Sequence, residues 1–451
     1  MLTISLSRTI AGRSSSIRNI SSPTITAGSH TRTTDDSDLA IKDYDRAIEL
    51  DPQYALAYDN RGEAYRNRGA EGDLDLAIAD YGLAIKLSPQ TTIYYNDRGL
   101  AYASKREYDL AIIDYSRAIE LDPKFFFAYS NRGRAYKNKK EYDLAIKDYD
   151  KAIELRPDDA ITYVDRGIAF DDKEAYDLAI ADYSLAIALN PKYTIAYNDR
   201  GISYKNKGDY DLAIKDYDRA IELDPQYARA YDNRGDAYRG RGAQGDLDRA
   251  IADYTSAIKY SPQSASYYVD RASAYDAGGD FEHAIADYDA AIQIDPKRAG
   301  AYFGRGRTRL YSGQVAAAIS EFRTAIEINP SYAYNALWLY IAQMRAGQNG
   351  STDLAEHAQK LDHGKWPWPV IALFLGSETP DRMRATAQSA SSPLRQREQV
   401  CEADFYLGIL RQQKGRQEEA RLLFQSAVNG CPKSFIEYVG ALHELAASAR
   451  H

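Results

Sequence analysis

The side chains in this sequence with the most chemical potential are six histidines, two cysteines and a recurring Asp-Tyr pair. No histidine stands at metal-ligand spacing from another histidine or a cysteine, so we predict no metal site. A neighbouring carboxylate and phenol, as in Asp114-Tyr115 and Asp148-Tyr149, could act as an acid–base pair. This pair recurs in unit after unit, however, and a catalytic site is not built eight times over. The sequence also has no glycine-rich phosphate loop and no Gly-x-Ser-x-Gly elbow. We therefore predict that the protein is not an enzyme and needs no cofactor.

The two cysteines, Cys401 and Cys431, cannot form a disulfide framework. They stand at the start of one predicted helix and at the end of the next. In an antiparallel hairpin those two ends lie side by side, so a single disulfide between them is geometrically open. The simpler interpretation is that each cysteine is a small buried residue, and on that basis we expect two free thiols.

Prolines recur along the chain at a nearly constant interval, which indicates an internal repeat. Most successive intervals are 34 residues long and two are 37. From this series we infer a half repeat followed by eight full repeats over residues 35–330. The prolines are Pro52, Pro89, Pro123, Pro157, Pro191, Pro225, Pro262, Pro296 and Pro330.

One unit, residues 92–124, shows how the elements of a repeat are arranged. Two apolar stripes at helical spacing, separated by a break at Arg106-Glu107, predict two helices. Gly99 has no side chain, so a neighbouring helix can approach it closely, and Tyr115 is the large apolar contact of the second helix. Pro123 ends the hairpin because proline lacks the amide hydrogen that a continuing helix needs. Each hairpin leaves an apolar face bare, so the hairpins must stack on one another.

This pattern resembles the tetratricopeptide repeat (TPR), whose signature is Trp-x2-Leu-Gly-x2-Tyr, then Ala-x3-Phe, then Pro. The resemblance covers about three-quarters of the chain. It implies an all-α fold, a right-handed α-solenoid of helix–turn–helix repeats with a divergent C-terminal helical segment. It also implies a protein–protein interaction scaffold. In the unit above, the signature reads Tyr95-x2-Arg98-Gly99-x2-Tyr102, Ala111-x3-Tyr115 and Pro123.

The main departure from that signature is an arginine in place of the leucine in every full repeat. A partly buried arginine requires a carboxylate, and an acidic residue precedes the second-helix aromatic residue in each repeat. We predict that the two sets form a ladder of structural ion pairs, within or between repeats. The arginines are Arg61, Arg98, Arg132, Arg166, Arg200, Arg234, Arg271 and Arg305, and the acids are Asp80, Asp114, Asp148, Asp182, Asp216, Asp253, Asp287 and Glu321.

Two repeats are three residues longer than the others, around Gly69-Ala70-Glu71 and Gly242-Ala243-Gln244. Residues 41–55 recur letter for letter as residues 214–228, which indicates a duplicated block of five repeats. The longer turns could be docking features. An insertion copied along with its block is the simpler interpretation.

In TPR proteins the first helices line the ligand groove, and the resemblance implies that positions 2, 5, 6, 9, 12 and 13 of each repeat face it. Position 4 is the first aromatic residue of the signature, such as Tyr95. Carboxylates and asparagines alternate with apolar residues at the facing positions, so we expect an acidic groove with an apolar floor. Asparagine side chains can hydrogen-bond a peptide backbone. We predict a protein or peptide partner with basic and apolar side chains. The candidate groove residues are Asn60, Asn96, Asp97, Phe127, Asn131, Asp165, Ile168, Asn198, Asp199, Asn233 and Asp270.

The charge and hydropathy of the chain restrict the other classes of partner. The formal net charge is −8, and the acidic excess lies outside the first 34 residues, which carry four arginines and no acid. An acidic body repels phosphate backbones, so we predict no nucleic-acid partner. No run of apolar residues is long enough for a transmembrane helix, and no small-molecule substrate is evident. The compartment stays open: cytoplasmic is the default, and a periplasmic or envelope location is the alternative.

The two ends of the chain depart from the repeat. Residues 1–34 are basic and rich in serine, as organelle transit peptides are, but we favour a disordered tail or a mis-assigned start because the array begins mid-repeat. Residues 331–361 form a degenerate repeat. Residues 362–400 are expected to be a linker with an extended aromatic segment, Trp366-Pro367-Trp368-Pro369. That segment could be a docking motif, although packing against the end of the solenoid is the simpler interpretation. Residues 401–451 are a final repeat and a capping helix.

From Trp366 onward the chain resembles the C-terminal part of NlpI-type bacterial envelope lipoproteins. That family uses its repeats to scaffold envelope proteases and peptidoglycan hydrolases. The resemblance therefore implies an alternative function, as a cell-envelope adaptor or a regulatory subunit of an enzyme complex. The family's lipid-bearing N-terminal cysteine is missing here, which leaves the envelope location open. The resemblance is carried by Phe405-Tyr406-Leu407-Gly408, by residues 423–428 and by Phe435-Ile436-Glu437-Tyr438.

Overall fold

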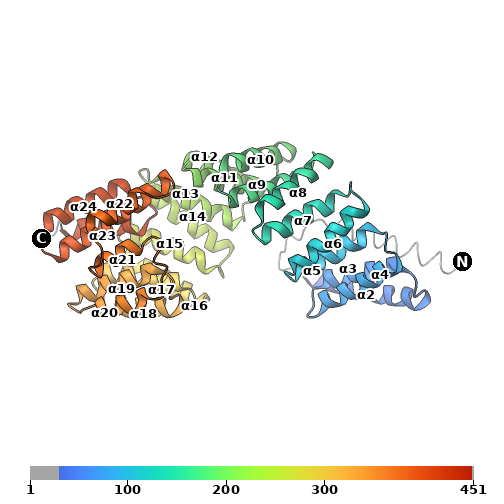
Figure 1. Cartoon of the computed structure of the whole chain (residues 1–451), viewed down its shortest axis with the longest axis horizontal. Helices are drawn as coiled ribbons and strands as arrows, with labels where there is room; N and C mark the ends of the chain where they lie inside the picture. The colour runs from blue at the N-terminus through green and yellow to red at the C-terminus, as the bar shows by residue number, and fades with distance from the viewer. Residues whose placement is uncertain (1–29, 449–451) are drawn as a thin grey trace. The chain divides into compact units, whose positions relative to one another are not determined.

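The computed structural model describes residues 30–448, and these are folded into helices that follow one another along the chain (Figure 1). No strand occurs among residues 30–448, and consecutive helices pair into hairpins that stack on their neighbours. The predicted all-α solenoid of helix–turn–helix repeats is thus confirmed. Most of residues 1–34, for which we predicted a tail or a targeting segment, lie outside the described residues.

The chain divides into two compact units, the first ending at Ala196 and the second beginning at Tyr197. In the first unit, α2 (His30–Leu50) precedes four hairpins, and the boundary falls inside α11 (Thr194–Lys207). The hairpins are α3 (Ala55–Arg68) with α4 (Asp73–Leu87), α5 (Thr92–Ser104) with α6 (Tyr108–Leu121), α7 (Phe126–Asn138) with α8 (Tyr142–Leu155), and α9 (Ala160–Asp172) with α10 (Tyr176–Leu189).

The second unit continues the same pattern and then departs from it. The regular helices are α12 (Tyr210–Leu223), α13 (Ala228–Arg241), α14 (Asp246–Tyr260), α15 (Ala265–Ala277), α16 (Phe281–Ile294), α17 (Ala299–Tyr311) and α18 (Val315–Ile328). The divergent helices are α19 (Ala333–Arg345), α20 (Ser351–Ala358), α21 (Trp368–Phe374), α22 (Pro380–Gln388), α23 (Pro393–Gln413), α24 (Gln417–Gly430) and α25 (Ile436–Ser448).

Alanine and tyrosine fill the core of each hairpin. In α6, Ala111, Tyr115 and Ala118 are buried, and the ring of Tyr115 lies against Gly99 of α5. A Cβ atom on Gly99 would stand 2.6 Å from Cε1 of Tyr115, so this position has to be glycine for the ring to pass. The close approach that the glycine predicted is therefore made by the second helix of its own repeat.

The predicted ladder of arginines and carboxylates is present in both units. In a typical rung, Nε and Nη2 of Arg166 donate to the two carboxylate oxygens of Asp182 over 2.8 and 2.7 Å. Nη1 of Arg166 donates over 2.6 Å to Asp150, on the second helix of the preceding repeat. One guanidinium therefore joins two repeats. The eight pairs are Arg61–Asp80, Arg98–Asp114, Arg132–Asp148, Arg166–Asp182, Arg200–Asp216, Arg234–Asp253, Arg271–Asp287 and Arg305–Glu321.

Aromatic rings cover the guanidinium groups of the ladder. The guanidinium carbon of Arg61 stands 5.6 Å from the ring centre of Tyr58 and 6.0 Å from that of Tyr65. Arginine stacks favourably on aromatic faces and forks onto carboxylates. The arginine that replaces leucine and the tyrosine that replaces tryptophan therefore form one charged, aromatic-covered contact. This contact accounts for many of the tyrosines in the chain.

The two longer turns are built in the same way. Gly69 and Gly72 adopt φ values of 67° and 83°, a left-handed backbone that favours glycine. Asp73 is buried, accepts from the backbone N–H of Ala70 and is paired with Arg68. The second copy, around Gly242, repeats this arrangement with Asp246 and Arg241.

The segment expected to be an extended linker, residues 362–400, is largely helical. Helix α21 begins at Trp368 with Pro369 in its first turn, and α22 begins with Pro380. Proline is well suited to the first turn of a helix, because the amide hydrogen it lacks would have no partner there. These prolines begin helices rather than prevent them. Helix α23 likewise starts at Pro393, before the predicted residue 401.

The aromatic residues of this segment pack against the core of the second unit, as the simpler interpretation proposed. Trp366 and Trp368 both contact that core, and Nε1 of Trp366 donates to Glu402 over 2.8 Å. The expectation of two free thiols is wrong, because Cys401 and Cys431 form a disulfide. Their Cα atoms lie 5.0 Å apart, where the α23–α24 hairpin brings the two segments together.

Among residues 30–448, no helix is both long enough and apolar enough to cross a membrane.

Candidate functional site

The first helices of the repeats present one continuous surface in each unit, which we call the first-helix face. It carries positions 2, 5, 6, 9 and 12 of α3, α5, α7 and α9 in the first unit, together with position 2 of α11. In the second unit it carries the remaining positions of α11 and those of α13, α15 and α17. In the first unit its most exposed large side chains are apolar and share position 2 of four successive repeats. They are Ile93, Phe127, Ile161 and Ile195, with 39%, 52%, 42% and 45% of their surface exposed.

The asparagines predicted to bind a peptide backbone hydrogen-bond one another instead. Nδ2 of Asn131 donates over 2.9 Å to Oδ1 of Asn96 in the preceding repeat, and Nδ2 of Asn233 donates over 2.9 Å to Oδ1 of Asn198. Asn60, Asn96, Asn198 and Asn233 are buried, whereas Asn131 is half-buried. Four of the five predicted asparagines thus lie beneath the surface. The asparagine pairs that are hydrogen-bonded to each other fix the register of neighbouring repeats.

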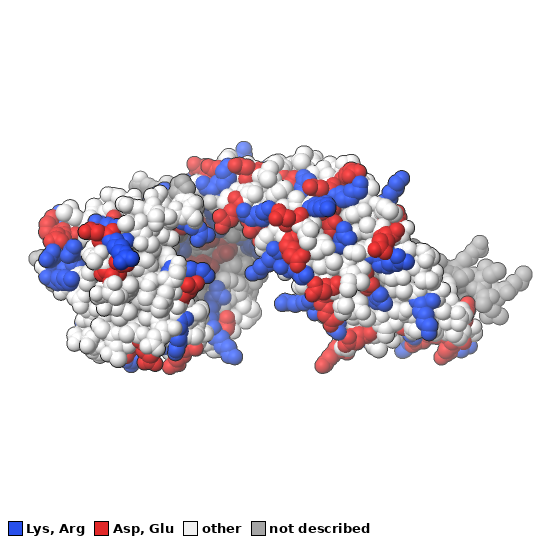
Figure 2. Space-filling model, viewed as in Figure 1, with Lys and Arg blue, Asp and Glu red and all other residues white. Residues whose placement is uncertain are grey.

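The carboxylates of the first unit face cations on the preceding repeat. Nε of Arg134 donates over 2.7 Å to Asp165, one repeat further along the chain. Burial raises the pKa of Asp165, and the charge of Arg134 opposes that rise. Asp97 interacts electrostatically with Arg66 of the preceding repeat. On the side of this unit that Figure 2 shows, acidic and basic side chains are likewise interspersed rather than gathered by sign.

The second unit arranges its acids differently. Asp236 of α13 is paired with Lys205 over 2.9 Å and accepts from the hydroxyl of Tyr254 over 2.9 Å, and its pKa is lowered because these partners outweigh burial. Asp232, one turn earlier, and Asp270 of α15 have no such partners. Burial and then mutual repulsion among the acids raise the pKa of Asp232 to about 8, and burial with the charge of Asp236 raises that of Asp270 to about 7.

The end of the chain covers the first-helix face of α15 and α17. Glu444 of α25 accepts from the hydroxyl of Tyr311 over 3.2 Å and is paired with Arg345. The ring of His443 lies 4.6 Å from that of Tyr311 and close to Asp276. Helix α25 therefore occupies the end of this face around Asp276 and Tyr311.

A second exposed apolar row was missed by the sequence analysis. It lies on the second helices, where the recurring Tyr-Asp-Leu-Ala-Ile motif leaves its leucine exposed between 43% and 54% in α6, α8, α10 and α12. The signal for this row in the sequence would have been the leucine that recurs in the same motif of successive repeats. The row is Leu110, Leu144 and Leu178 in the first unit and Leu212 in the second.

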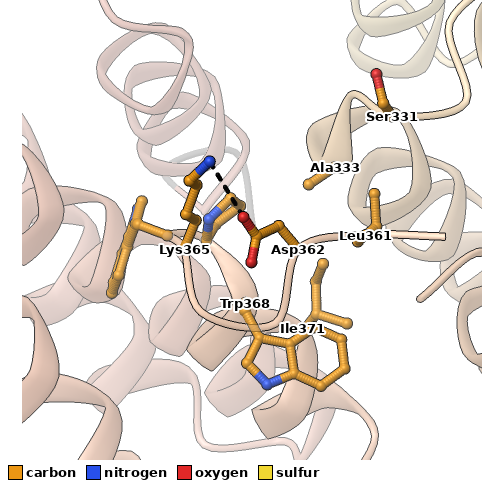
Figure 3. A pocket seen from close by; sticks show the side chains of 9 residues that line it. Ser331, Ala333, Leu361, Asp362, Lys365, Trp368 and Ile371 are labelled. Carbon is orange, nitrogen blue, oxygen red and sulfur yellow. Dashed lines mark ion pairs between the residues drawn. The ribbon is translucent and has the colours of Figure 1, made fainter. Parts of the chain in front are cut away.

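A cavity of about 260 Å³ lies beside the aromatic segment of the second unit (Figure 3). Asp362 and Lys365 form an ion pair at its edge, with Trp368 and Ile371 on another side. Ser331 and Trp366 donate to Asn329 and Glu402 outside it. These polar groups are already paired, so we assign no ligand to the cavity. It is lined by Ser331, Ala333, Leu361, Asp362, Lys365, Trp366, Pro367, Trp368 and Ile371.

No group of metal-ligating side chains occurs among the residues that the structure describes.

Comparisons with known proteins identify the repeat. Models of the tetratricopeptide repeat match residues 36–69, 93–125, 126–159, 194–227, 216–252, 239–299 and 299–332. Among solved structures the chain is similar to YrrB, described as a TPR protein with an unusual peptide-binding site. The two are 26% identical over 40% of this chain and 92% of that one, with a TM-score of 0.34. It is also similar to MamA, 30% identical over 38% of this chain and 97% of that one, with a TM-score of 0.34.

Among curated proteins the chain is similar to the lipoprotein NlpI homolog of Haemophilus influenzae. The two are 29% identical over 114 residues, which are 25% of this chain and 36% of that lipoprotein. The match therefore spans about a third of the relative's length.

Proposed function

We propose, from the premise that this chain belongs to the tetratricopeptide-repeat family, that its first-helix face binds segments of partner proteins and that it has no catalytic role. The observation that carries this proposal is the row of four exposed apolar side chains at position 2, Ile93, Phe127, Ile161 and Ile195. Large apolar side chains held at one position of successive repeats form a regular surface that a partner can bury.

The spacing of this row favours particular ligands. Packed helices stand about 8–10 Å apart, so successive repeats offer an apolar contact at about that interval. A helix rises about 1.5 Å per residue and meets the interval every seventh residue. An extended segment in the polyproline II conformation rises about 3.1 Å per residue and turns once every three residues, so every third side chain meets the interval on one face. Asp97 and Asp165 lie on the same face beside Arg66 and Arg134, and we propose that basic side chains of the ligand share these carboxylates with the two arginines.

The experiment measures the affinity of two synthetic peptides by fluorescence anisotropy. One carries leucine at every seventh position and the other at every third, with lysine and arginine between, and a scrambled peptide of each composition is the reference. The test variant is I93S/F127S/I161S. The control is L110S/L144S/L178S, which removes three exposed apolar side chains from the second helices without changing the charge.

We expect the first-helix variant to bind about tenfold or more weakly, since each side chain buried on binding contributes roughly 1 kcal/mol. The control should stay within about twofold of the wild type. The reverse result would place the ligand on the second-helix leucines. Equal affinities for the designed and the scrambled peptides would contradict the proposal.

The basic component of the ligand has its own test. Reversing Asp97, Asp165 and Asp199 to lysine should weaken binding and remove most of its dependence on salt. The control reverses Glu120, Glu154 and Glu222, which are 64–67% exposed on the second helices. The two triple variants change the net charge equally. Equal affinities would therefore show that overall charge, and not the first-helix face, attracts the peptide.

A second candidate function is an adaptor or regulatory subunit in a bacterial cell envelope. The Cys401–Cys431 disulfide supports it, because disulfides persist mainly in oxidising compartments such as the periplasm. The similarity to a lipoprotein points the same way. Mass spectrometry of protein that is isolated from cells, denatured and alkylated without reductant should show both cysteines unalkylated, because they are joined by the disulfide. Two alkylated cysteines would place the native protein in a reducing compartment and remove this candidate.

A further inference from the structure

Two carboxylates on the first-helix face of the second unit, those of Asp232 and Asp270, make no hydrogen bond or ion pair with any described residue. Oδ1 of Asp232 is withdrawn from solvent as well as unpartnered. Both residues are half-buried, and an unpaired carboxylate in that position is costly because burial removes part of its hydration and nothing replaces it. No cation among the described residues therefore pairs with either carboxylate.

The neighbouring cations are engaged elsewhere or lie at the edge. Lys205 of α11 is paired with Asp236. Nη2 of Arg239 donates over 3.0 Å to the hydroxyl of Ser273. Arg229, at the start of α13, is exposed to solvent. None of the three forms an ion pair with Asp232 or Asp270, although all three contribute to the field around them.

A buried hydroxyl lies on the same side of the repeat. Tyr217 is fully buried and its hydroxyl has no partner, as is also true of Tyr81 and Tyr149 in the first unit. At the same position Tyr183 donates to Asp171 and Tyr254 donates to Asp236, both on first helices. The hydroxyl of Tyr217 is accordingly directed toward the first-helix face, with its ring against Gly201 of α11, and it interacts electrostatically with Asp236, Asp199, Asp216 and Asp232.

Two tyrosines flank the carboxylates. Tyr267 of α15 lies near Asp232 and Arg229, and burial followed by the charge of Asp232 raises the pKa of its hydroxyl. Tyr227 precedes α13 and interacts electrostatically with Tyr267. A planar cation could stack on such rings while it hydrogen-bonds to carboxylates.

We infer that Asp232, Asp270 and the hydroxyl of Tyr217 form a site for an arginine side chain of the partner. This inference rests on the proposed function, since the arginine belongs to the bound segment. A guanidinium has five N–H donors in a flat fork, enough for both carboxylates and for a lone pair of the hydroxyl. Lysine presents three donors and no plane to stack, so it fits less well.

The site predicts how binding depends on pH. Asp232 is faced by Lys205 on α11, by Arg229 and Asp236 on α13, and by Tyr267 and Asp270 on α15. Asp270 is faced in addition by Arg239 and, from the segment before α17, by Arg298. With pKa values of about 8 and about 7, both carboxyls are partly protonated at neutral pH. A guanidinium binds the ionised forms and expels their protons, so affinity rises as pH increases from 6 to 8.5.

The experiment uses the full-length protein and the tighter of the two leucine-containing peptides described above. Each arginine of the peptide is replaced in turn by citrulline, which keeps the shape and loses the charge, and by lysine. The protein variant is D232N/D270N, and the control is D109N/D143N, whose side chains are 81% and 86% exposed. Circular dichroism confirms that both variants are folded.

We expect one citrulline replacement to weaken binding about tenfold or more, and lysine at that position to weaken it less. D232N/D270N should weaken binding of the arginine peptide by about the same factor, with no further loss when citrulline is also present. Binding to the wild type should tighten about tenfold between pH 6 and 8.5, and this change should disappear in D232N/D270N. The control variant should match the wild type.

Peptide binding that depends on Ile93, Phe127 and Ile161 but not on Asp232 and Asp270 would overturn the arginine site and leave the proposed function standing. Peptide binding that depends on neither set of residues would overturn both the arginine site and the proposed function. A direct probe separates the cases: N-acetylarginine amide should lower the pH midpoints of the Asp232 and Asp270 carboxyl carbon signals, and N-acetylcitrulline amide should not. Equal effects of the two amides would also overturn the arginine site.

Discussion

The first-helix faces of the two units are built from the same repeat but balance their charges differently. In the first unit Asp165 accepts from Arg134, which stands 31 residues earlier in the preceding repeat. In the second unit Arg239 stands 31 residues before Asp270, yet it donates to Ser273. Asp270 therefore keeps no partner, and neither does Asp232.

The comparison shows that sequence similarity between repeats does not preserve pairing. The ladder of Arg166–Asp182 and its equivalents recurs in both units, because both partners occupy fixed positions of the repeat. Pairing on the first-helix face depends on positions that vary, and there an arginine can donate to a serine such as Ser273 instead of an acid. A structural framework and a variable surface thus occupy different positions of one repeat.

The largest effect is expected from breaking the shared ladder. Arg166→Leu in the first unit and Arg271→Leu in the second each leave a buried aspartate without its cation. Each should lower the free energy of unfolding by about 3 kcal/mol. The losses should be similar, since both rungs hold a buried aspartate, although Nη1 of Arg166 also pairs with Asp150 whereas Nη1 of Arg271 donates to Thr255. Urea unfolding followed by circular dichroism measures the loss.

The control for the ladder is the double variant R166L/D182L, which removes the stranded charge and should recover more than half of the loss. Unequal effects in the two units, or a loss under about 1 kcal/mol, would contradict the view that the ladder is a common framework.

A smaller effect is expected from making the first unit resemble the second. Arg134→Leu leaves Asp165 without its partner. Because the Arg134 side chain is 42% exposed, we discount the cost for solvent screening and expect a loss of about 1–2 kcal/mol. The carboxyl of Asp165 should also titrate at higher pH than in the wild type. The matched control is Arg117→Leu, which breaks an exposed pair with Glu120 and should cost less than about 0.5 kcal/mol. Equal losses of unfolding free energy in the Arg134→Leu and Arg117→Leu variants would contradict the distinction between paired and solvated acids.

A third effect is expected from removing an unpaired acid. The folded protein holds a proton on Asp232 up to a pKa of about 8, whereas the unfolded chain loses it near the ordinary value of 3.8. Because the folded state binds more protons in that window, ionisation of Asp232 destabilises the fold as pH rises from about 4 to 8. Asp232→Asn should therefore stabilise the protein, and by more at pH 9 than at pH 5.

Thermal unfolding of the wild type and the D232N variant at both pH values tests this sign. Glu437, whose pKa burial raises to about 8, contributes in the same direction in both proteins and cancels in the difference. A variant that is less stable than the wild type at pH 9 would mean that Asp232 has a partner in the folded protein.

The sequence was sufficient for the features that recur at fixed positions. The proline intervals predicted the hairpins, and the invariant Arg–Asp positions predicted the ladder, because a period in sequence becomes a period in space. The linker prediction for residues 362–400 failed because Pro380 fits the first turn of a helix as well as it ends one. The predicted hairpin already placed Cys401 and Cys431 side by side, but the sequence does not distinguish a disulfide from two buried thiols, so the bond itself was not expected.

The candidate site could be predicted only in outline. The resemblance to TPR proteins implied the helical positions that face outward, and the apolar row at Phe127 and Ile161 is found there. Which polar groups remain available depends on contacts between repeats: Asn96 and Asn198 are occupied by Asn131 and Asn233. Those contacts depend on side-chain reach across a repeat boundary, which spacing alone does not specify.

The central claim is that Asp232 and Asp270 lack partners while Asp236, one turn away on the same helix as Asp232, has them. Carbon-13 NMR of the side-chain carboxyl groups across a pH titration tests this directly in the free protein. The account predicts midpoints of about 8 for Asp232 and about 7 for Asp270, with Asp236 below the ordinary value of 3.8. Three midpoints together near 4 would contradict it.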